Sequence, residues 1–281
     1  MNETNKTRLR ARSILQRTGA SCALALVLYV TASAQTTPAQ SDNEYQTGAT
    51  LWQQSSAEAR ALQYQAYRLA RLMLDRDLRI HNKSKLKRAV VVDIDETLLD
   101  NTRFQAGQIV SHTAFNSKDW IEWCNTAKAS AIPGAVEFLR YAAGRGVRVF
   151  YVTNRGMPEK PGTMTNLKQL GFPGVGDETV IVRTDVSSKE PRRQKISESY
   201  RIVLLCGDNL NDFTNLFEGK TTGERNAAAD AARRKFGTQF IVLPNPTYGD
   251  WESAIYGYDS KLSDSEKAAR RKAALKTPKE R

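Results

Sequence analysis

Histidine and cysteine are scarce in this chain of 281 residues, which contains two histidines and three cysteines. Two histidines exclude a multi-histidine metal site, because such sites use three or more imidazole ligands. Three cysteines exclude both a disulfide-dense scaffold and a zinc site of four thiolates. Long apolar runs are also missing, since the run at 22–30 is much shorter than the roughly 20 residues of a membrane-spanning helix.

Positive charge is abundant, with 42 Lys and Arg residues against 30 Asp and Glu residues and a net charge of +12. Such a balance suggests nucleic acid or anionic lipid as a partner. The charge is concentrated at the ends. Residues 1–34 hold five basic and one acidic residue, residues 261–281 hold eight and three, and the remainder holds 29 and 26. The basicity therefore does not describe a binding face, and we expect no nucleic-acid partner. Binding of DNA through the basic ends is the weaker alternative.

Residues 1–34 are typical of a secretory signal peptide. Five basic residues precede the apolar run at 22–30, and Ala32 and Ala34 match the small-residue cleavage pattern. We expect cleavage after Ala34, export to the periplasm or the outside, and no stable membrane insertion afterwards; a retained signal is the alternative. Cys22 begins the apolar run instead of following it, so an outer-membrane lipid anchor is not expected.

Export would leave two cysteines, Cys124 and Cys206. An oxidising compartment permits a disulfide between them. However, Cys206 ends a strand-like run and Cys124 lies in a helical-looking stretch, so we expect two separate buried thiols.

The segment after the signal begins with a polar linker at 35–48 and continues as a predicted helix at 49–80. Apolar residues of this helix recur at helical spacing, at Leu62, Ala66, Leu69 and Met73. The last part of the chain, 261–281, favours a solvated helix with frayed ends; a basic arm for membranes or phosphate polymers is the alternative.

Apolar runs alternate with helical segments through the middle of the chain. The expected strands are 89–92, 147–152, 180–182, 202–206 and 240–243. This alternation predicts an α/β fold, a doubly wound and mostly parallel sheet with helices on both faces. We predict one domain at 49–260, with cap elements at about 49–82 and 104–132, where the second segment interrupts the alternation. With 40% hydrophobic residues, the chain can bury a real core.

The first chemical motif is the sequence VVVDIDETLLDN at 90–101, where an apolar strand runs directly into Asp93 and Asp95. Two neighbouring carboxylates either share a proton or bind a metal ion. A carboxylate placed in line with phosphorus can also act as a nucleophile. Both side chains share one face of an extended chain, although a turn could redirect one of them.

Two further strand ends carry polar residues, and ligands of open α/β sheets bind beyond such ends. Thr153 and Asn154 follow one strand and can donate to phosphate oxygens without adding charge. Asp208 and Asp212 follow another, and Lys189 supplies a point charge for a transferring phosphoryl group. Each motif is weak alone; their order along the chain makes coincidence improbable.

The motif DIDET, followed by VTN, a lysine and GDNLND, resembles the haloacid dehalogenase-like (HAD) phosphohydrolases. More narrowly, the chain is similar to the class C bacterial acid phosphatases, which are exported nonspecific phosphatases that include outer-membrane lipoproteins and 5′-nucleotidases. The similarity covers most of residues 45–257 and includes KDWIEW, AIPGAVEFL and LPNPTYGDWE. It implies a HAD-like fold with an inserted cap.

The resemblance also implies roles for the four aspartates. Asp93 would attack phosphorus, and Asp95 would protonate the leaving group and then activate water. Mg²⁺ would be held by the Asp93 carboxylate, the Asp95 backbone carbonyl and Asp208, with Asp212 orienting the waters of the metal. Ligation by oxygen alone suits a hard cation.

Further site residues follow from the same resemblance. Thr153, Asn154 and Lys189 would hold the phosphoryl group, and Glu96 would support the site. Trp120 and Tyr248 match aromatic residues that enclose the base or ring of the substrate, which implies broad use of nucleoside monophosphates. Phe104 stands where the family has a tyrosine that could touch substrate.

We therefore expect an Mg²⁺-dependent exported acid phosphatase that acts on small phosphomonoesters, 5′-nucleotides included, through an aspartyl-phosphate. The resemblance also implies a homodimer. The alternative is a non-catalytic protein that uses the same fold to bind haem or a nucleotide, but such a protein would not need Asp95.

Overall fold

The computed structural model describes residues 43–80 and 85–278. The expected signal peptide and its cleavage point lie outside the described residues. The helices are α1 (Thr47–Ser55), α2 (Ala57–Arg79), α3 (Thr102–Ser111), α4 (Ser117–Thr126), α5 (Ala135–Gly144), α6 (Lys160–Leu170), α7 (Glu190–Ser197), α8 (Thr222–Ala232), α9 (Asp250–Ser253) and α10 (Asp264–Ala273). Short 3₁₀ helices are η1 (Glu44–Gln46), η2 (Met157–Glu159), η3 (Leu210–Asp212) and η4 (Asn215–Phe217).

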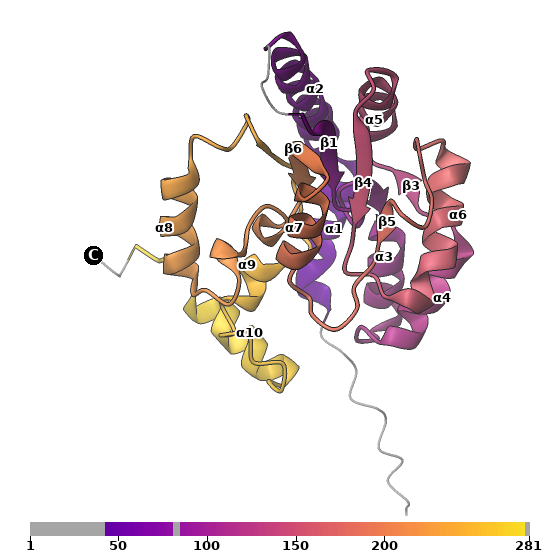
Figure 1. Ribbon diagram of the computed structural model, residues 1–281. Coiled ribbons are helices and arrows are strands. Elements are labelled where there is room, and N and C mark those ends of the chain that lie inside the picture. Colours follow the sequence, from indigo (N-terminus) through magenta and orange to yellow (C-terminus); the bar gives the residue numbers. More distant parts are fainter. Residues whose placement is uncertain (1–42, 81–84, 279–281) are drawn as a thin grey trace, which may run out of the picture. The chain divides into compact units, whose positions relative to one another are not determined.

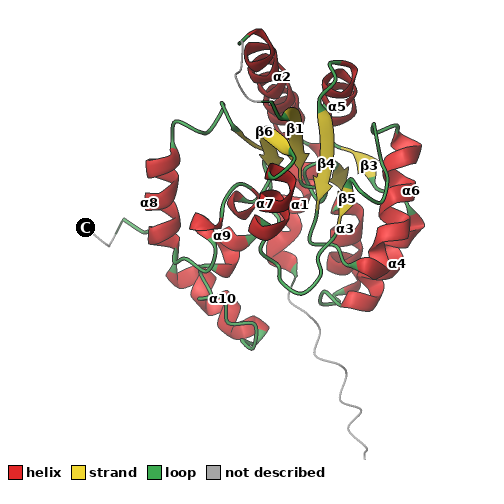
Figure 2. Ribbon diagram, viewed as in Figure 1, coloured by secondary structure: helices red, strands yellow, loops and turns green. Residues whose placement is uncertain are grey.

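The strands form one parallel sheet of five and one antiparallel pair (Figure 2). They are β1 (Lys87–Val92), β2 (Leu99–Asp100), β3 (Ser130–Ala131), β4 (Arg148–Val152), β5 (Val180–Ile181), β6 (Tyr200–Gly207) and β7 (Phe240–Val242). The large sheet has the order β5-β4-β1-β6-β7 and every neighbouring pair is parallel. The predicted strands and the doubly wound α/β fold are confirmed.

Alternation along β1 divides the core into two layers. Val90 and Val92 pack on the face that α2 and α5 cover, while Ala89 and Val91 pack on the face of α7, with its Ile196 (Figure 1). A strand covered on both faces needs apolar side chains of both parities, which is why this run lacks polar residues. The two layers hold the carboxyl end of β1 rigidly at the centre of the sheet.

The helix α2, in the segment assigned to a cap, packs against this core. Its buried side chains are Ala59, Gln63, Ala66, Tyr67, Ala70 and Leu74. Of the predicted stripe, Ala66 is buried as expected, but Leu62 is 42% exposed and Leu69 and Met73 are only partly buried. The buried positions lie one residue further along, at Gln63, Ala70 and Leu74. The hydroxyl of Tyr67 donates to the carbonyl oxygen of Thr97, and this bond helps to turn the Tyr67 face of α2 toward the core.

The segment predicted as an insertion, 104–132, forms α3, α4 and the small strand β3, which pairs with β2. The helix α4 lies against the start of α6. At Gly162 a Cβ atom would stand 2.4 Å from the Cα atom of Asn125, and the amide of Gly162 donates to the Asn125 side chain. Only glycine permits this approach, which fixes α4 relative to the strand end that precedes α6.

The two cysteines of the described chain are separate buried thiols, as predicted: Cys124 lies on α4 and Cys206 on β6. The tail is helical over α10, with no buried residue and with a capping box at Ser263 and Glu266. In the described part of the chain, none of the helices combines the length and apolar character that crossing a bilayer requires.

Candidate active site

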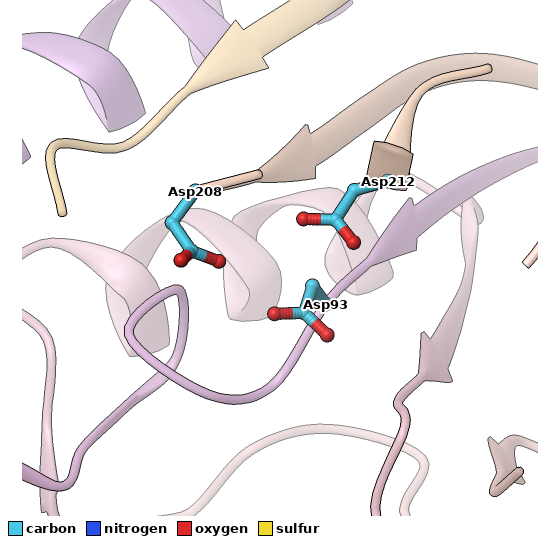
Figure 3. Close-up of side chains that lie close together, drawn as sticks. All are labelled: Asp93, Asp208 and Asp212. Atoms are coloured by element: carbon cyan, nitrogen blue, oxygen red, sulfur yellow. The ribbon is translucent and has the colours of Figure 1, made fainter. Parts of the chain in front are cut away.

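The carboxylates of Asp93, Asp208 and Asp212 meet at the carboxyl edge of the sheet. Asp93 follows β1, Asp208 follows β6, and Asp212 ends η3. One oxygen atom from each carboxylate lies within 4.8 Å of the other two, and Figure 3 shows the three side chains directed toward a common point. The register explains the meeting, because Val92 pairs with Cys206 and the two strands end side by side.

Lys189 is the cation of this cluster. Its Nζ donates to Oδ1 of Asp93 and to Oδ1 of Asp212, the latter at 2.6 Å. It precedes α7 and is 6% exposed. Burial alone would lower the pKa of Lys189, but the carboxylates of Asp212 and Asp93 raise it, so the lysine stays charged.

One ammonium group does not balance three carboxylates. Burial raises the pKa of Asp93 well above its usual range, Lys189 opposes the rise, and Asp212 and Asp208 add to it. Burial and the neighbouring Asp212 also raise the pKa of Asp208 to about 7. A divalent cation among these oxygens would relieve the repulsion, and oxygen donors suit a hard cation.

Asp95 lies apart from the three carboxylates, because the turn after β1 redirects its side chain. The Oδ1 atom of Asp95 accepts from Nε and Nη2 of Arg155 at 2.9 and 2.7 Å and from Nδ2 of Asn101 at 2.9 Å. Glu96 follows with a φ of 53°, a left-handed conformation that turns the chain. The side chains of Asp93 and Asp95 are therefore available for different tasks.

Thr153 and Asn154 lie at the end of β4, beside Asp95. The hydroxyl of Thr153 is 3.4 Å from Oδ2 of Asp95. Arg192 donates to the carbonyl oxygen of Thr153 and to Oδ1 of Asn154, both at 2.6 Å. The second bond orients the Asn154 amide so that its NH₂ group remains a donor. A cavity of about 230 Å³ opens here, and Asn154 and Lys189 line it.

A ring of supporting residues holds the acidic centre. Thr97 places its hydroxyl 3.2 Å from Oδ1 of Asp208, and Asn245 donates to Oδ2 at 2.8 Å. Gly207 packs directly against Asp212, since a Cβ atom there would stand 2.4 Å from Oδ2 of that aspartate. Small and polar neighbours thus determine the direction of each carboxylate.

The predicted aromatic residues Trp120 and Tyr248 contact different residues of the site. Phe104 lies 5.2 Å from Trp120 between ring centroids, and the guanidinium of Arg155 lies 5.3 Å from the Trp120 ring. Tyr248 donates its hydroxyl to Oε2 of the buried Glu96. Burial, with Asp95 second, raises the pKa of Glu96 to about 8. Trp120 and Tyr248 form no ring pair among the described residues.

This geometry has known counterparts. The family model described as HAD superfamily, subfamily IIIB (Acid phosphatase), matches residues 7–251. The chain belongs to this acid phosphatase family. It is an enzyme, and phosphatases of this superfamily use a divalent metal, for which the three carboxylates are a fitting site.

Solved and curated relatives agree with this membership. The class C acid phosphatase from Bacillus anthracis is 40% identical, with a TM-score of 0.80, and the match covers 84% of this chain and 98% of that one. A stem 28 kDa glycoprotein of Glycine max is 26% identical over 205 residues, 70% of each chain. Acid phosphatase 1 of Solanum lycopersicum is 26% identical over 130 residues, which are 43% of this chain and 50% of that protein.

The sequence did not identify every residue of the acid phosphatase site. The residues that were missed are Thr97, Asn101, Arg155, Arg192 and Asn245. Arg155 is the arginine of VTNR and Asn101 ends DETLLDN, so both stand inside the motifs. Their position in the motifs was a signal, but the burial of Arg155, which is only 2% exposed, depends on partners that only the fold supplies.

We expect Arg155→Lys to lower the kcat for phosphomonoesters by about tenfold or more, because a lysine cannot reproduce the planar fork that holds Asp95. The measurement is phosphate release at saturating substrate, with the exposed Arg145→Lys as the matched control. A kcat equal to that of the control would show that Arg155 does not position Asp95.

Proposed function

We propose that the chain is an exported, Mg²⁺-dependent acid phosphatase that hydrolyses small phosphomonoesters, 5′-nucleotides among them. The observation that carries the proposal is the separation of two kinds of carboxylate at one strand end. Asp93 belongs to the charged cluster with Asp208, Asp212 and Lys189, whereas Asp95 is held outside it by Arg155.

In the proposed reaction, an oxygen of Asp93 attacks phosphorus as the bond from phosphorus to the leaving oxygen breaks, and an aspartyl-phosphate forms. Asp95, as the acid, gives its proton to the leaving oxygen. Asp95 then takes a proton from water, whose oxygen attacks phosphorus and releases orthophosphate and the free Asp93 carboxylate. The bond to Arg155 keeps the Asp95 carboxylate turned to this task.

The phosphoryl group would lie between Lys189 and the residues Thr153 and Asn154. Positioning and neutralisation of charge supply most of the catalysis in phosphoryl transfer. Mg²⁺, held by Asp93, Asp208 and Asp212 with the backbone of Asp95, would add positive charge on the phosphoryl oxygens. The all-oxygen donor set and its uncompensated charge fit this ion.

The substrate preference rests on the aromatic residues. Trp120 lies against Arg155, which binds Asp95, and Tyr248 donates to Glu96. Tyr248 is 36% exposed. An aromatic side chain that reaches the substrate can stack on any nucleobase or aryl group, because stacking does not depend on a hydrogen-bonding pattern.

Export rests on the sequence of residues 1–34, and the homodimer rests on the resemblance to class C enzymes. Comparing the mass of the secreted protein with that of the full chain tests cleavage after Ala34. Light scattering of the purified protein tests the dimer.

The activity is tested with a panel of p-nitrophenyl phosphate, AMP and glycerol phosphate, each with Mg²⁺, with Ca²⁺ and with a chelator, between about pH 5 and 7. We expect Mg²⁺-dependent phosphate release, faster with the two aromatic substrates. Release that is unchanged by the chelator, or no release from any substrate, would contradict the proposal.

A further inference from the structure

The helix α10 lies beyond the residues that the family model matches, which end at 251. None of its residues is buried, so packing alone does not explain its place in the structure. Two arginines connect it to the rest of the described chain. Arg270 donates to the carbonyl oxygen of Tyr256 at 2.9 Å, and Arg271 makes a larger set of contacts.

Arg271 joins two segments that are far apart in sequence. Its guanidinium carbon lies 3.5 Å from the ring centroid of Tyr45, on η1. Its Nη1 donates to the Tyr256 hydroxyl at 2.7 Å and lies 3.6 Å from Oε1 of Glu252, on α9. Glu252 is a buried carboxylate, and Tyr256 also donates to it. Loss of Arg271 would therefore leave a buried carboxylate without its cation.

Both segments flank the loop at 244–249. On one side, Gln46, next to Tyr45, donates to the carbonyl oxygen of Thr247 at 3.3 Å, and Gln53 of α1 donates to that of Pro244 at 3.3 Å. On the other side, α9 begins directly after the loop, at Asp250. Arg271 thus closes a ring of contacts around the loop.

The loop carries two contacts of the active site. Asn245 donates to Asp208, and Tyr248 donates to Glu96. Thr247 fixes the Asn245 side chain, since its backbone amide and its hydroxyl both donate to the Asn245 Oδ1 atom, at 2.9 and 2.6 Å. A shift of the loop would therefore move a neighbour of the proposed metal ligand and the proposed substrate ring together.

The packing between α1 and α3 includes several buried polar side-chain atoms without a hydrogen-bond partner in the described chain. The buried side-chain atoms without a hydrogen-bond partner in the described chain all lie on these two helices: Thr47 Oγ1, Thr50 Oγ1, Gln53 Oε1, Gln105 Oε1 and Gln108 Nε2. Buried polar groups without partners weaken an interface. Contacts on the other side of η1, among which the stack of Arg271 on Tyr45 is the charged one, therefore add to the positioning of this segment.

We propose that α10 is a clasp that positions the loop 244–249, with Arg271 as the positioning residue for Tyr248 and Asn245. This inference rests on the proposed function, because it assigns Tyr248 to the substrate side of the site. It gives the basic tail a task within the enzyme, in place of the membrane or polymer contact that its charge alone suggested.

The test compares Arg271→Ala and Arg271→Lys with Lys272→Ala, which removes an exposed basic side chain from the same helix. At saturating Mg²⁺, which offsets a weakened contact between Asn245 and Asp208, we expect Arg271→Ala to raise the KM for AMP about three- to tenfold with kcat within about twofold. The rise should be smaller for glycerol phosphate, which has no ring to contact Tyr248. Arg271→Lys should fall between Arg271→Ala and the wild type, and Lys272→Ala should match the wild type.

Hydrogen–deuterium exchange gives a readout that needs no activity. We expect faster exchange at 43–55 and 244–249 in Arg271→Ala, and no change in α5 or α7. Unchanged exchange at 244–249, or equal KM changes for both substrates, would overturn the clasp. A wild-type protein that releases no phosphate would overturn the proposed function instead, and the exchange measurement would still decide the clasp.

Discussion

Replacing Asp93 by asparagine is expected to lower the turnover of every phosphomonoester by at least about 10³-fold, because the amide cannot form the aspartyl-phosphate. The fold should persist. The substitution removes one of three mutually repelling carboxylates, and Lys189 keeps its contact with Asp212. The measurement is phosphate release in saturating Mg²⁺, together with the midpoint of thermal denaturation.

A matched control for Asp93→Asn is Asp230→Asn, which makes the same chemical change on the exposed face of α8. We expect wild-type turnover from the control. A variant at position 93 that stays folded and retains more than about a tenth of the activity would assign the nucleophile elsewhere. Trapping of phosphate on the wild-type chain after an acid quench, absent in the variant, gives an independent check of the covalent step.

The sequence predicted the sheet well because its central strands are buried on both faces. Runs such as 89–92 and 202–206 contain no polar residue, and a five-stranded parallel sheet offers few other places for them. The aspartates at their ends could be identified for the same reason, since a carboxylate directly after a buried strand needs a chemical explanation.

Side-chain direction and long-range partners could not be predicted in this way. Asp93 and Asp95 have equal parity in the sequence, but Asp95 lies in the loop after β1, where Arg155 and Asn101 bind its carboxylate. Apart from its place in the motif VTNR, nothing in the sequence distinguishes Arg155 from the other basic residues, because its partners Asp95 and Trp120 come close to it only in the fold. The same holds for Arg271, whose partners lie about 20 and 225 residues away along the chain.

Metal binding should change the stability of the protein as well as its activity, and Asp208→Asn separates the two effects. In the metal-free protein the raised pKa of Asp208, about 7, means that the folded state binds a proton more tightly than the unfolded chain. The contribution of this group to stability is therefore fully present below the usual aspartate pKa of about 4 and is lost as the pH rises through about 7. We expect the metal-free wild type to be less stable at about pH 8 than at about pH 5, and Asp208→Asn to flatten this dependence.

Mg²⁺ should reverse the trend in the wild type, because an ion that binds only the folded state adds about 2.7 kcal/mol at a hundredfold excess over its Kd. The variant should lose most of that gain and also most of its turnover, since one of three carboxylate ligands is missing. Thermal denaturation with a chelator and with Mg²⁺, at both pH values, measures the pH dependence of stability and the stabilisation by Mg²⁺. Asp230→Asn again serves as the control. An equal Mg²⁺ shift in Asp208→Asn and the wild type would place the metal outside the three carboxylates. A second outcome would contradict the role of charge repulsion: a metal-free Asp208→Asn that is less stable than the wild type at about pH 8. Asp208 would then act mainly as an acceptor for Thr97 and Asn245. Lys189 would already balance the charge of the carboxylates at the strand ends.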